Sequence, residues 1–398
     1  MTHGGASPSY DASVGALYVH VPFCARKCAY CDFVSDATDR NNPCMDAYLD
    51  ERLHEIERSA GLGLLWGCKT AYVGGGTPTL LGAYRLGKLI RAIRDACPQL
   101  DELSCEANPD SLHDDVLAAM TEAGATRVSV GVQSLDDDEL TALGRLHTAA
   151  QAAERVRAAV RAGLDVSVDL MCAIPRQTDS SWDKTLREVV GLGVGHVSVY
   201  PLVIEEGTPF HARYGSEMMP WNDEDVQAER MERAREVLEA AGLMRYEVAS
   251  YARDGKRCRH NMAYWTGVEY LGLGRGAASM VGAATYSVVR ELYGWLPEPP
   301  TKEREAGRGA SRMRFSTLDR QVEFLDAREA WAEDLMLGMR LTQGVEAARM
   351  DEVPQVRDDL IARGLIRREG DRLAPTHDGW LLGNELFGAL WELADERS

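Results

Sequence analysis

Six short apolar runs, rich in β-branched residues, recur through the first half of the chain and alternate with segments of helical periodicity. The runs, which predict strands, are Leu17–Val21, Thr70–Val73, Leu103–Glu106, Arg127–Val132, Asp165–Met171 and His196–Tyr200. Between them Leu, Val, Ile and Ala recur at three- and four-residue steps, and the predicted helices are Leu80–Cys97, Asp114–Ala123, Ala149–Ala162 and Trp182–Leu192. Strand and helix alternating six times indicates parallel βαβ units.

Six such units are too few to close an eight-stranded barrel. We therefore predict an α/β fold built on an open, partial (β/α)6 barrel. A doubly wound sheet is the alternative, and the pattern alone does not separate the two. A further helix is predicted over Asn222–Ala241, and the stretch Tyr246–Ala284 is less regular.

The last quarter of the chain has a different organisation. Glu298–Arg314 is rich in Pro, Gly and charge, which predicts a linker or exposed loop. Beyond it, helices over Ala327–Arg340 and Asp351–Arg363 precede a short hairpin and a last helix, the order of a winged-helix-like α+β domain. The predicted organisation is an N-terminal extension (1–15), the barrel with its C-terminal extension (16–296), a linker or exposed loop (297–320) and the C-terminal domain (321–398).

Charge and cysteine usage limit the partners and the compartment. With 44 basic and 62 acidic residues the net charge is −18, which repels phosphate backbones, so we expect no nucleic-acid partner and a structural or docking role for the C-terminal domain. The N-terminus lacks the apolar core of a signal peptide, and no apolar run of about 18 residues exists. Nine cysteines without an export signal predict a reducing, cytoplasmic location. Peripheral membrane contact and a homodimer stay open.

The strongest chemical signal is the triad Cys24-x3-Cys28-x2-Cys31, directly after the first strand. Three thiolates on a short loop can each ligate one iron of a [4Fe–4S] cluster and leave the fourth iron open. The alternative is a zinc site, which needs four ligands, usually as two separated pairs. The nearest candidate, Cys44, is 13 residues further on, so we favour the cluster.

This triad after Tyr-Val-His-Val-Pro-Phe resembles the radical SAM superfamily. The wider context, Y-V-H-V-P-F-C-x3-C-x-Y-C-D-F, is similar to the branch that contains oxygen-independent coproporphyrinogen III oxidase (HemN) and the heme chaperone HemW, and the resemblance extends over residues 17–390. It implies that the open iron holds S-adenosylmethionine (SAM).

The resemblance also implies which residues contact SAM. A turn of three glycines, Gly74–Gly76, follows the second strand, and in the family it meets the amino group of the methionine part of SAM. Other polar residues lie at the carboxyl ends of later strands, which face the mouth of a βα barrel; taken singly, each fits a helix cap or a surface pair equally well. The residues assigned to SAM are Tyr18, Tyr30, Gly75, Gly76, Thr77, Glu106, Gln133, Arg145 and Asp169.

Two departures bear on function. The coproporphyrinogen oxidases of this branch carry a further cysteine two positions after the third ligand, where this chain has Phe33, and a longer segment before the first cysteine. Both differences favour a heme chaperone that binds heme and passes it to an acceptor protein, with no residue assigned to catalysis. The alternatives are a coproporphyrinogen III oxidase or another radical SAM enzyme that acts on a porphyrin.

A third signal, His260-Asn-x-x-Tyr264-Trp265, matches the H-N-x-x-Y-W pattern of HemW. Imidazole is a common axial ligand of heme iron, so we predict that His260 binds heme, with Cys258 as the second candidate. The alternative is a structural histidine that holds its segment in place by hydrogen bonds.

Overall fold

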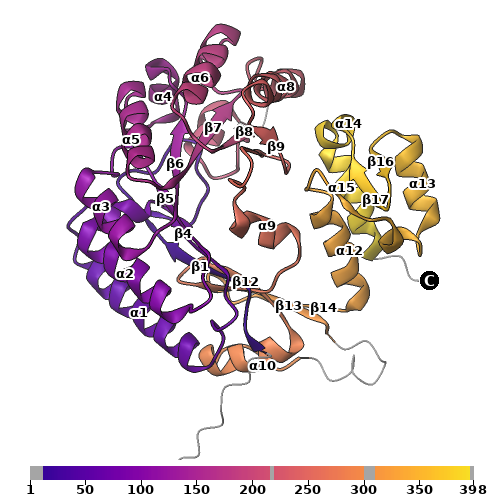
Figure 1. Ribbon diagram of the computed structural model, residues 1–398, viewed down its shortest axis with the longest axis horizontal. Helices are drawn as coiled ribbons and strands as arrows, with labels where there is room; N and C mark the ends of the chain where they lie inside the picture. Colours follow the sequence, from indigo (N-terminus) through magenta and orange to yellow (C-terminus); the bar gives the residue numbers. More distant parts are fainter. Residues whose placement is uncertain (1–11, 216–218, 300–309, 395–398) are drawn as a thin grey trace, which may run out of the picture.

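The predicted parallel sheet forms the centre of the molecule (Figure 1). The computed structural model describes residues 12–215, 219–299 and 310–394. Six parallel strands lie side by side in chain order. They are β1 (Ala16–Val21), β4 (Thr70–Gly75), β5 (Glu102–Ala107), β6 (Arg127–Gln133), β7 (Asp165–Cys172) and β8 (His196–Pro201). A doubly wound sheet would reverse its strand order at a switch point, so this order confirms the partial barrel.

Because the crossovers all run in one direction, their helices cover the outer face of the sheet (Figure 1). They are α1 (Cys44–Gly61), η2 (Pro78–Leu81), α2 (Gly82–Ala96), α3 (Asp114–Ala123), α4 (Asp137–Leu143), α5 (Ala149–Arg161) and α6 (Asp179–Gly191). Helices α1 and α4 were not predicted.

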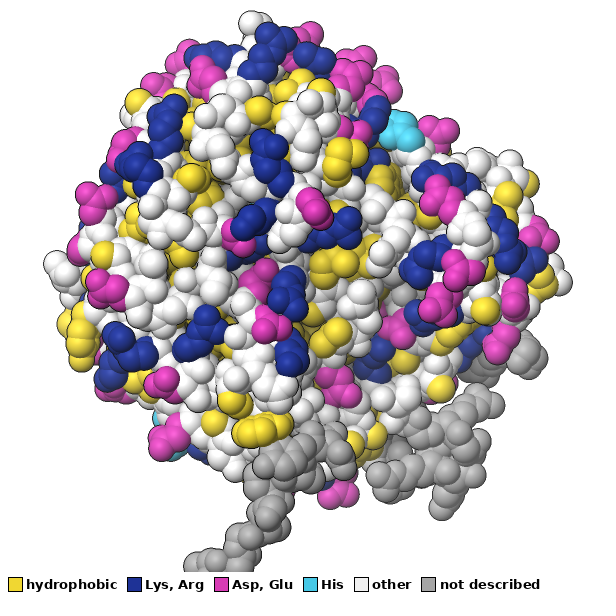
Figure 2. All heavy atoms as spheres, in the orientation of Figure 1, with side chains coloured by type: hydrophobic (Ala, Val, Ile, Leu, Met, Phe, Trp, Pro, Cys, Tyr) yellow, Lys and Arg dark blue, Asp and Glu magenta, His cyan; other side chains and the backbone are white. Residues whose placement is uncertain are grey.

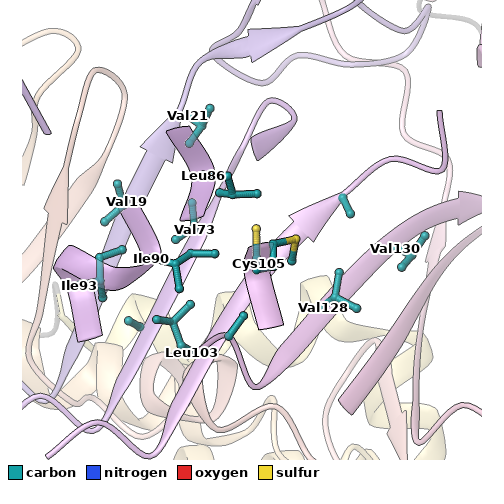
Figure 3. Packing of buried hydrophobic residues seen from close by; sticks show 14 of the residues in the cluster. Val19, Val21, Val73, Leu86, Ile90, Ile93, Leu103, Cys105, Val128 and Val130 are labelled. Atoms are coloured by element: carbon teal, nitrogen blue, oxygen red, sulfur yellow. The ribbon is translucent and has the colours of Figure 1, made fainter. Parts of the chain in front are cut away.

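The outer face of the strands packs against these helices (Figure 3). Leu86, Ile90 and Ile93 of α2 are fully buried against strand residues such as Val73 and Leu103. Their spacing of four and three residues places them on one helix face. This packing holds the strands in register and sets their carboxyl ends at one edge of the sheet.

The sheet continues beyond the six strands on both sides. Next to β1 lies β11 (Tyr270–Leu273), in parallel, followed by the antiparallel strands β12 (Ala278–Gly282), β13 (Arg312–Ser316) and β14 (Val322–Leu325). Beyond β8 come β10 (Ser250–Ala252) and β9 (Met244–Arg245). A separate short pair joins β2 (Phe23–Cys24) to β3 (Asp36–Ala37), and the remaining helices of this part are α7 (Pro209–Tyr214), α8 (Glu224–Ala240), α9 (Arg259–Trp265) and α10 (Ala283–Leu292).

These strands correct two expectations. The stretch 246–284 is regular, because it supplies β10, α9, β11 and β12. The prediction of a linker or exposed loop over 297–320 is wrong for 312–316, since β13 pairs with both β12 and β14. Residues 300–309 of that segment lie outside the described residues, as do 1–11 of the predicted N-terminal extension. Val14, also in that extension, is fully buried, and its N–H donates to the carbonyl of Leu64.

The C-terminal domain has its own core and a three-stranded sheet in the order β15-β17-β16. Its elements are α12 (Ala327–Gly338), β15 (Val345–Glu346), η3 (Ala347–Met350), α13 (Pro354–Ala362), β16 (Ile366–Glu369), β17 (Arg372–Pro375), α14 (His377–Leu381), α15 (Gly383–Trp391) and η4 (Glu392–Ala394). The predicted hairpin is β16–β17; the two-residue strand β15 was not predicted.

Specific contacts hold this domain against the barrel. Glu333 of α12 is buried and accepts hydrogen bonds from Arg312 (Nη1 to Oε2, 2.8 Å) and Arg314 of β13. The guanidinium of Arg340 lies 5.0 Å from the ring centre of Trp265 in α9. The domain therefore packs directly on the barrel.

Charged side chains of both signs are interspersed on the face drawn in Figure 2, with no extended basic patch among its described residues. None of the described helices is long and apolar enough to cross a membrane.

Candidate functional site

A cavity of about 370 Å³ enters the barrel at the carboxyl ends of its strands. The cysteine loop and the glycine turn form the wall of the cavity at the carboxyl ends of β1 and β4. Inward-facing side chains of β5 to β8 form the sides, and Cys258 and Asn261, at the start of α9, line its deep end. The cavity brings together most of the predicted site residues: Cys24, Cys28, Tyr30, Cys31, Gly75, Gly76, Thr77, Glu106, Gln133, Arg145 and Asp169.

The three cysteines lie on this wall as free thiols, Cys24 buried and the other two half-buried. Each of two sulfurs faces a donor: the Thr77 hydroxyl is 3.5 Å from Cys24 Sγ, and Arg145 Nη1 is 3.4 Å from Cys28 Sγ. Donors at this distance suit sulfurs that carry negative charge as metal-bound thiolates. The residues therefore fit an iron–sulfur cluster.

The alternative of a single metal ion requires ligands that converge on one point. Within the described ranges, no three His, Cys, Asp or Glu side chains converge as ligands of one ion. A zinc ion needs such convergence, whereas a cubane spreads three thiolates over three irons. Cys44, the alternative fourth ligand, is exposed at the start of α1 and does not line the cavity.

The glycine turn packs directly against the cysteine loop. The N–H groups of Gly76 and Thr77 donate to the carbonyls of Val21 (2.8 Å) and Phe23 (2.7 Å), just before Cys24. A Cβ on Gly76 would lie 2.6 Å from the Phe23 oxygen, so only glycine allows this approach. These two N–H groups already donate hydrogen bonds within the protein. The turn therefore has only its carbonyl oxygens left to accept hydrogen bonds from the amino group of a ligand.

Two half-buried carboxyl groups face the cavity. Glu106 accepts hydrogen bonds from Gly75 N (2.9 Å) and the Tyr72 hydroxyl (3.0 Å), and Asp169 accepts from the Ser129 hydroxyl (2.9 and 3.1 Å to its two oxygens). Burial raises the pKa of Glu106 to about 7 and that of Asp169 to about 6. Both groups ionise more readily when a cation binds beside them, so the cavity suits a positively charged ligand.

Arg145 joins the end of β6 to the cysteine loop. Its Nη2 donates to the carbonyl of Gly131 and to Asn108 Oδ1, both at 2.7 Å, while Nη1 faces Cys28. Gln133, where β6 is irregular, has a φ of +66°, a conformation that costs energy for a residue with a side chain. Such strain is typical of ligand-binding positions.

The predicted aromatic contacts differ in their position relative to the cavity. Tyr30 lines the cavity, but Tyr18 does not. The Tyr18 ring stacks behind Tyr72, with centroids 6.3 Å apart, and its hydroxyl is 3.0 Å from His20 Nδ1. Tyr72, the register partner of Tyr18 in β4, does line the cavity, because Tyr72 and Gly74 alternate along the inward face of that strand. That alternation is the sequence signal that could have identified it.

His260 differs most from its prediction as a heme ligand. It lies in α9 rather than in a loop, and it is 1% exposed. Its Nδ1 is 3.1 Å from the hydroxyl of Thr70 and its Nε2 is 2.9 Å from that of Tyr264. Burial lowers the pKa of His260 to about 3, so the ring is neutral. With both nitrogens bonded inside the protein, this geometry favours the structural alternative.

The motif around His260 closes the amino end of the barrel. Thr70 opens β4, and Glu102, at the start of β5, accepts hydrogen bonds from the backbone N–H groups of Arg259 (3.1 Å) and His260 (3.0 Å). Cys258, the second candidate ligand, is buried at the cavity floor, with its Sγ 3.7 Å from Glu102 Oε1.

We expect His260→Ala to lower the free energy of unfolding by about 1–3 kcal/mol, because the buried hydroxyl of Thr70 and the partly buried hydroxyl of Tyr264 lose their partner. The position of the Soret band of added hemin should not change. Urea unfolding and hemin spectra measure the two quantities, with exposed His54→Ala on α1 as the control. A shifted Soret band at unchanged stability would restore His260 as the heme ligand.

The chain is similar to known proteins along nearly its whole length. The radical SAM superfamily model matches residues 18–189, and the HemN C-terminal domain model matches 325–382. The heme chaperone HemW of Mycobacterium tuberculosis H37Rv is 35% identical over 380 residues, 94% of each chain. That of Bacillus subtilis is 32% identical over 94% of this chain and 98% of the relative. The structure of Escherichia coli coproporphyrinogen III oxidase (HemN), described as a radical SAM enzyme, superposes with a TM-score of 0.71 at 19% identity, covering 95% of this chain and 90% of that one.

Proposed function

Because the chain belongs to the HemW family of radical SAM proteins, we propose that it is a cytoplasmic heme chaperone, which binds heme and transfers it to an acceptor protein. The observation that carries this proposal is identity to heme chaperones along nearly the whole of both chains, C-terminal domain included. The fold likeness to HemN supports the architecture alone.

We propose further that Cys24, Cys28 and Cys31 hold a [4Fe–4S] cluster and that the cavity beside them holds SAM. When bound, the cluster supplies an electron that can cleave the sulfonium of SAM. The protein's part is positioning: Thr77 and Arg145 donate toward the cysteine sulfurs. The carboxyl groups of Glu106 and Asp169 offer acceptors and negative charge to the cationic ligand.

The raised pKa of Glu106 predicts a pH-dependent contribution to SAM binding. In the free protein the carboxylate forms only as the pH rises through about 7, so its attraction for SAM is present at pH 8 and largely lost at pH 6. The ratio of wild-type to Glu106→Gln affinity should therefore be about tenfold larger at pH 8 than at pH 6. Equilibrium SAM binding to reconstituted protein measures the ratio, in which titration of SAM itself cancels. A ratio independent of pH would contradict the role of Glu106.

A hemin titration and an assay with coproporphyrinogen III test the proposed function. Anaerobically reconstituted protein should develop a Soret band with hemin and release the heme to an apoprotein such as apomyoglobin. The same protein, reduced and given SAM and coproporphyrinogen III, should form no protoporphyrinogen. Product at a catalytic rate would replace the chaperone with the oxidase, and absence of a Soret band would refute heme binding.

A further inference from the structure

The rim of the barrel cavity exposes large aromatic side chains. Phe33, just after the third cysteine, is 59% exposed, and Tyr200, at the end of β8, is 43% exposed; both line the cavity, and the Tyr200 hydroxyl lies beside Ser198 and Asp169. Leu146 and Val203, also exposed, follow in the loops after Arg145 and Tyr200. Single exposed apolar residues are ordinary on a protein surface, but two aromatic rings on the rim of one cavity suit a ligand with an apolar face.

Two cations lie on the same rim. Arg26 and Lys27, in the cysteine loop, are exposed and line the cavity. Arg26 Nη2 donates to the carbonyl of Gly144 (2.6 Å), and in the part of the chain that the structure describes neither residue forms an ion pair with a carboxylate. In a chain of net charge −18, these unpaired cations make the rim locally attractive to an anionic group.

The deeper cavity has the opposite character. Ser129, Ser167 and Ser198 line its sides, together with the carboxyl groups of Glu106 and Asp169. The guanidinium of Arg127 also lines it, but lies 3.4 Å from the carboxylate of Glu102, which offsets its charge. A large apolar ligand with carboxylates of its own would lose hydration there and meet like charge. Such a ligand is therefore confined to the rim, while a small cation fits below.

We propose that this rim, formed by Phe33 and Tyr200 with Arg26 and Lys27, is where heme binds. The porphyrin plane lies against the two rings, and its propionates face the two cations. The proposal rests on the proposed heme-chaperone function and specifies where the heme lies. It puts the heme at the carboxyl end of the barrel, opposite the end that His260 closes.

Hemin titration of the full-length reconstituted protein tests the rim. We expect Phe33→Ser combined with Lys27→Glu to weaken hemin binding by at least about tenfold, because a stacked ring and a charge pair are lost. The matched control is Tyr84→Ser combined with Lys88→Glu, an exposed aromatic and lysine on the outer helix α2, which should bind within about twofold of wild type. Iron content should equal that of wild type in both.

A second variant tests the rim outside the cysteine loop, and a second ligand tests the charge pair separately. Tyr200→Ser, at the end of β8, should also weaken hemin binding. It serves as the test of the rim if the first variant loses iron. Hemin dimethyl ester, whose propionates are capped, should bind wild type and Lys27→Glu equally, whereas hemin should bind the variant more weakly.

The outcomes separate this inference from the proposed function. If wild type binds no hemin, the chaperone proposal fails and the rim proposal fails with it. If wild type binds hemin and the rim variants bind it equally well, the chaperone stands and the rim is not the heme site. If heme binding is unchanged and only transfer to the apoprotein slows, the rim contacts the acceptor protein instead, which also overturns the inference.

Discussion

Replacing Cys24, Cys28 or Cys31 by alanine should abolish the iron–sulfur cluster, whereas replacing Cys44 should leave it in place. Each of the three thiols is one of only three protein ligands, so the loss of one leaves two irons open. Cys44 is also a free thiol, but it is exposed and lies outside the cavity, which makes Cys44→Ala the matched control.

The measurement is iron and acid-labile sulfide after anaerobic reconstitution, together with visible charge-transfer absorption. Wild type and Cys44→Ala should hold about four irons per chain, and each triad variant should lose most of them. Retention of the cluster in Cys28→Ala and its loss in Cys44→Ala would show that the ligand assignment is wrong.

Replacing Glu333 by alanine should destabilise the protein by about 1.5–3 kcal/mol, because Arg312 and Arg314 lose their buried carboxylate partner. Arg312 keeps its ion pair with Asp334, which limits the loss. The Glu333 side chain is 4% exposed and pairs with Arg312, whose side chain is 14% exposed, and with Arg314. Glu333 belongs to the C-terminal domain and β13 to the barrel sheet, so the change acts on the contact between the domains.

Glu323→Ala is the matched control for this prediction. Glu323 pairs with the same Arg314, but its side chain is 59% exposed, and a surface ion pair contributes at most about 1 kcal/mol. Urea unfolding of the reconstituted protein, with limited proteolysis between the domains, should separate the two variants clearly. Equal destabilisation by both would show that the buried pair contributes nothing to domain docking.

The sequence alone carried the information that depends on local spacing. The triad Cys24, Cys28 and Cys31 lies within eight consecutive residues, so its placement on one loop needs no knowledge of distant contacts. The six parallel strands followed from apolar runs, because strands buried on both faces have little freedom in composition. The serines at 129, 167 and 198 alternate with buried valines in β6, β7 and β8, a pattern that also identifies cavity-facing positions.

The tertiary structure decided everything that depends on partners distant in the chain. β11 joins β1 across about 250 residues, and no local pattern specifies that pairing. Tyr18 and Tyr72 are register partners on neighbouring strands, and only the tertiary structure shows that the Tyr72 ring lines the cavity. Histidine is a common ligand of heme iron, but the ring nitrogens of His260 are hydrogen-bonded to Thr70, 190 residues earlier, and to Tyr264. Whether a histidine is free to bind a ligand depends on such contacts, which form only when the chain is folded.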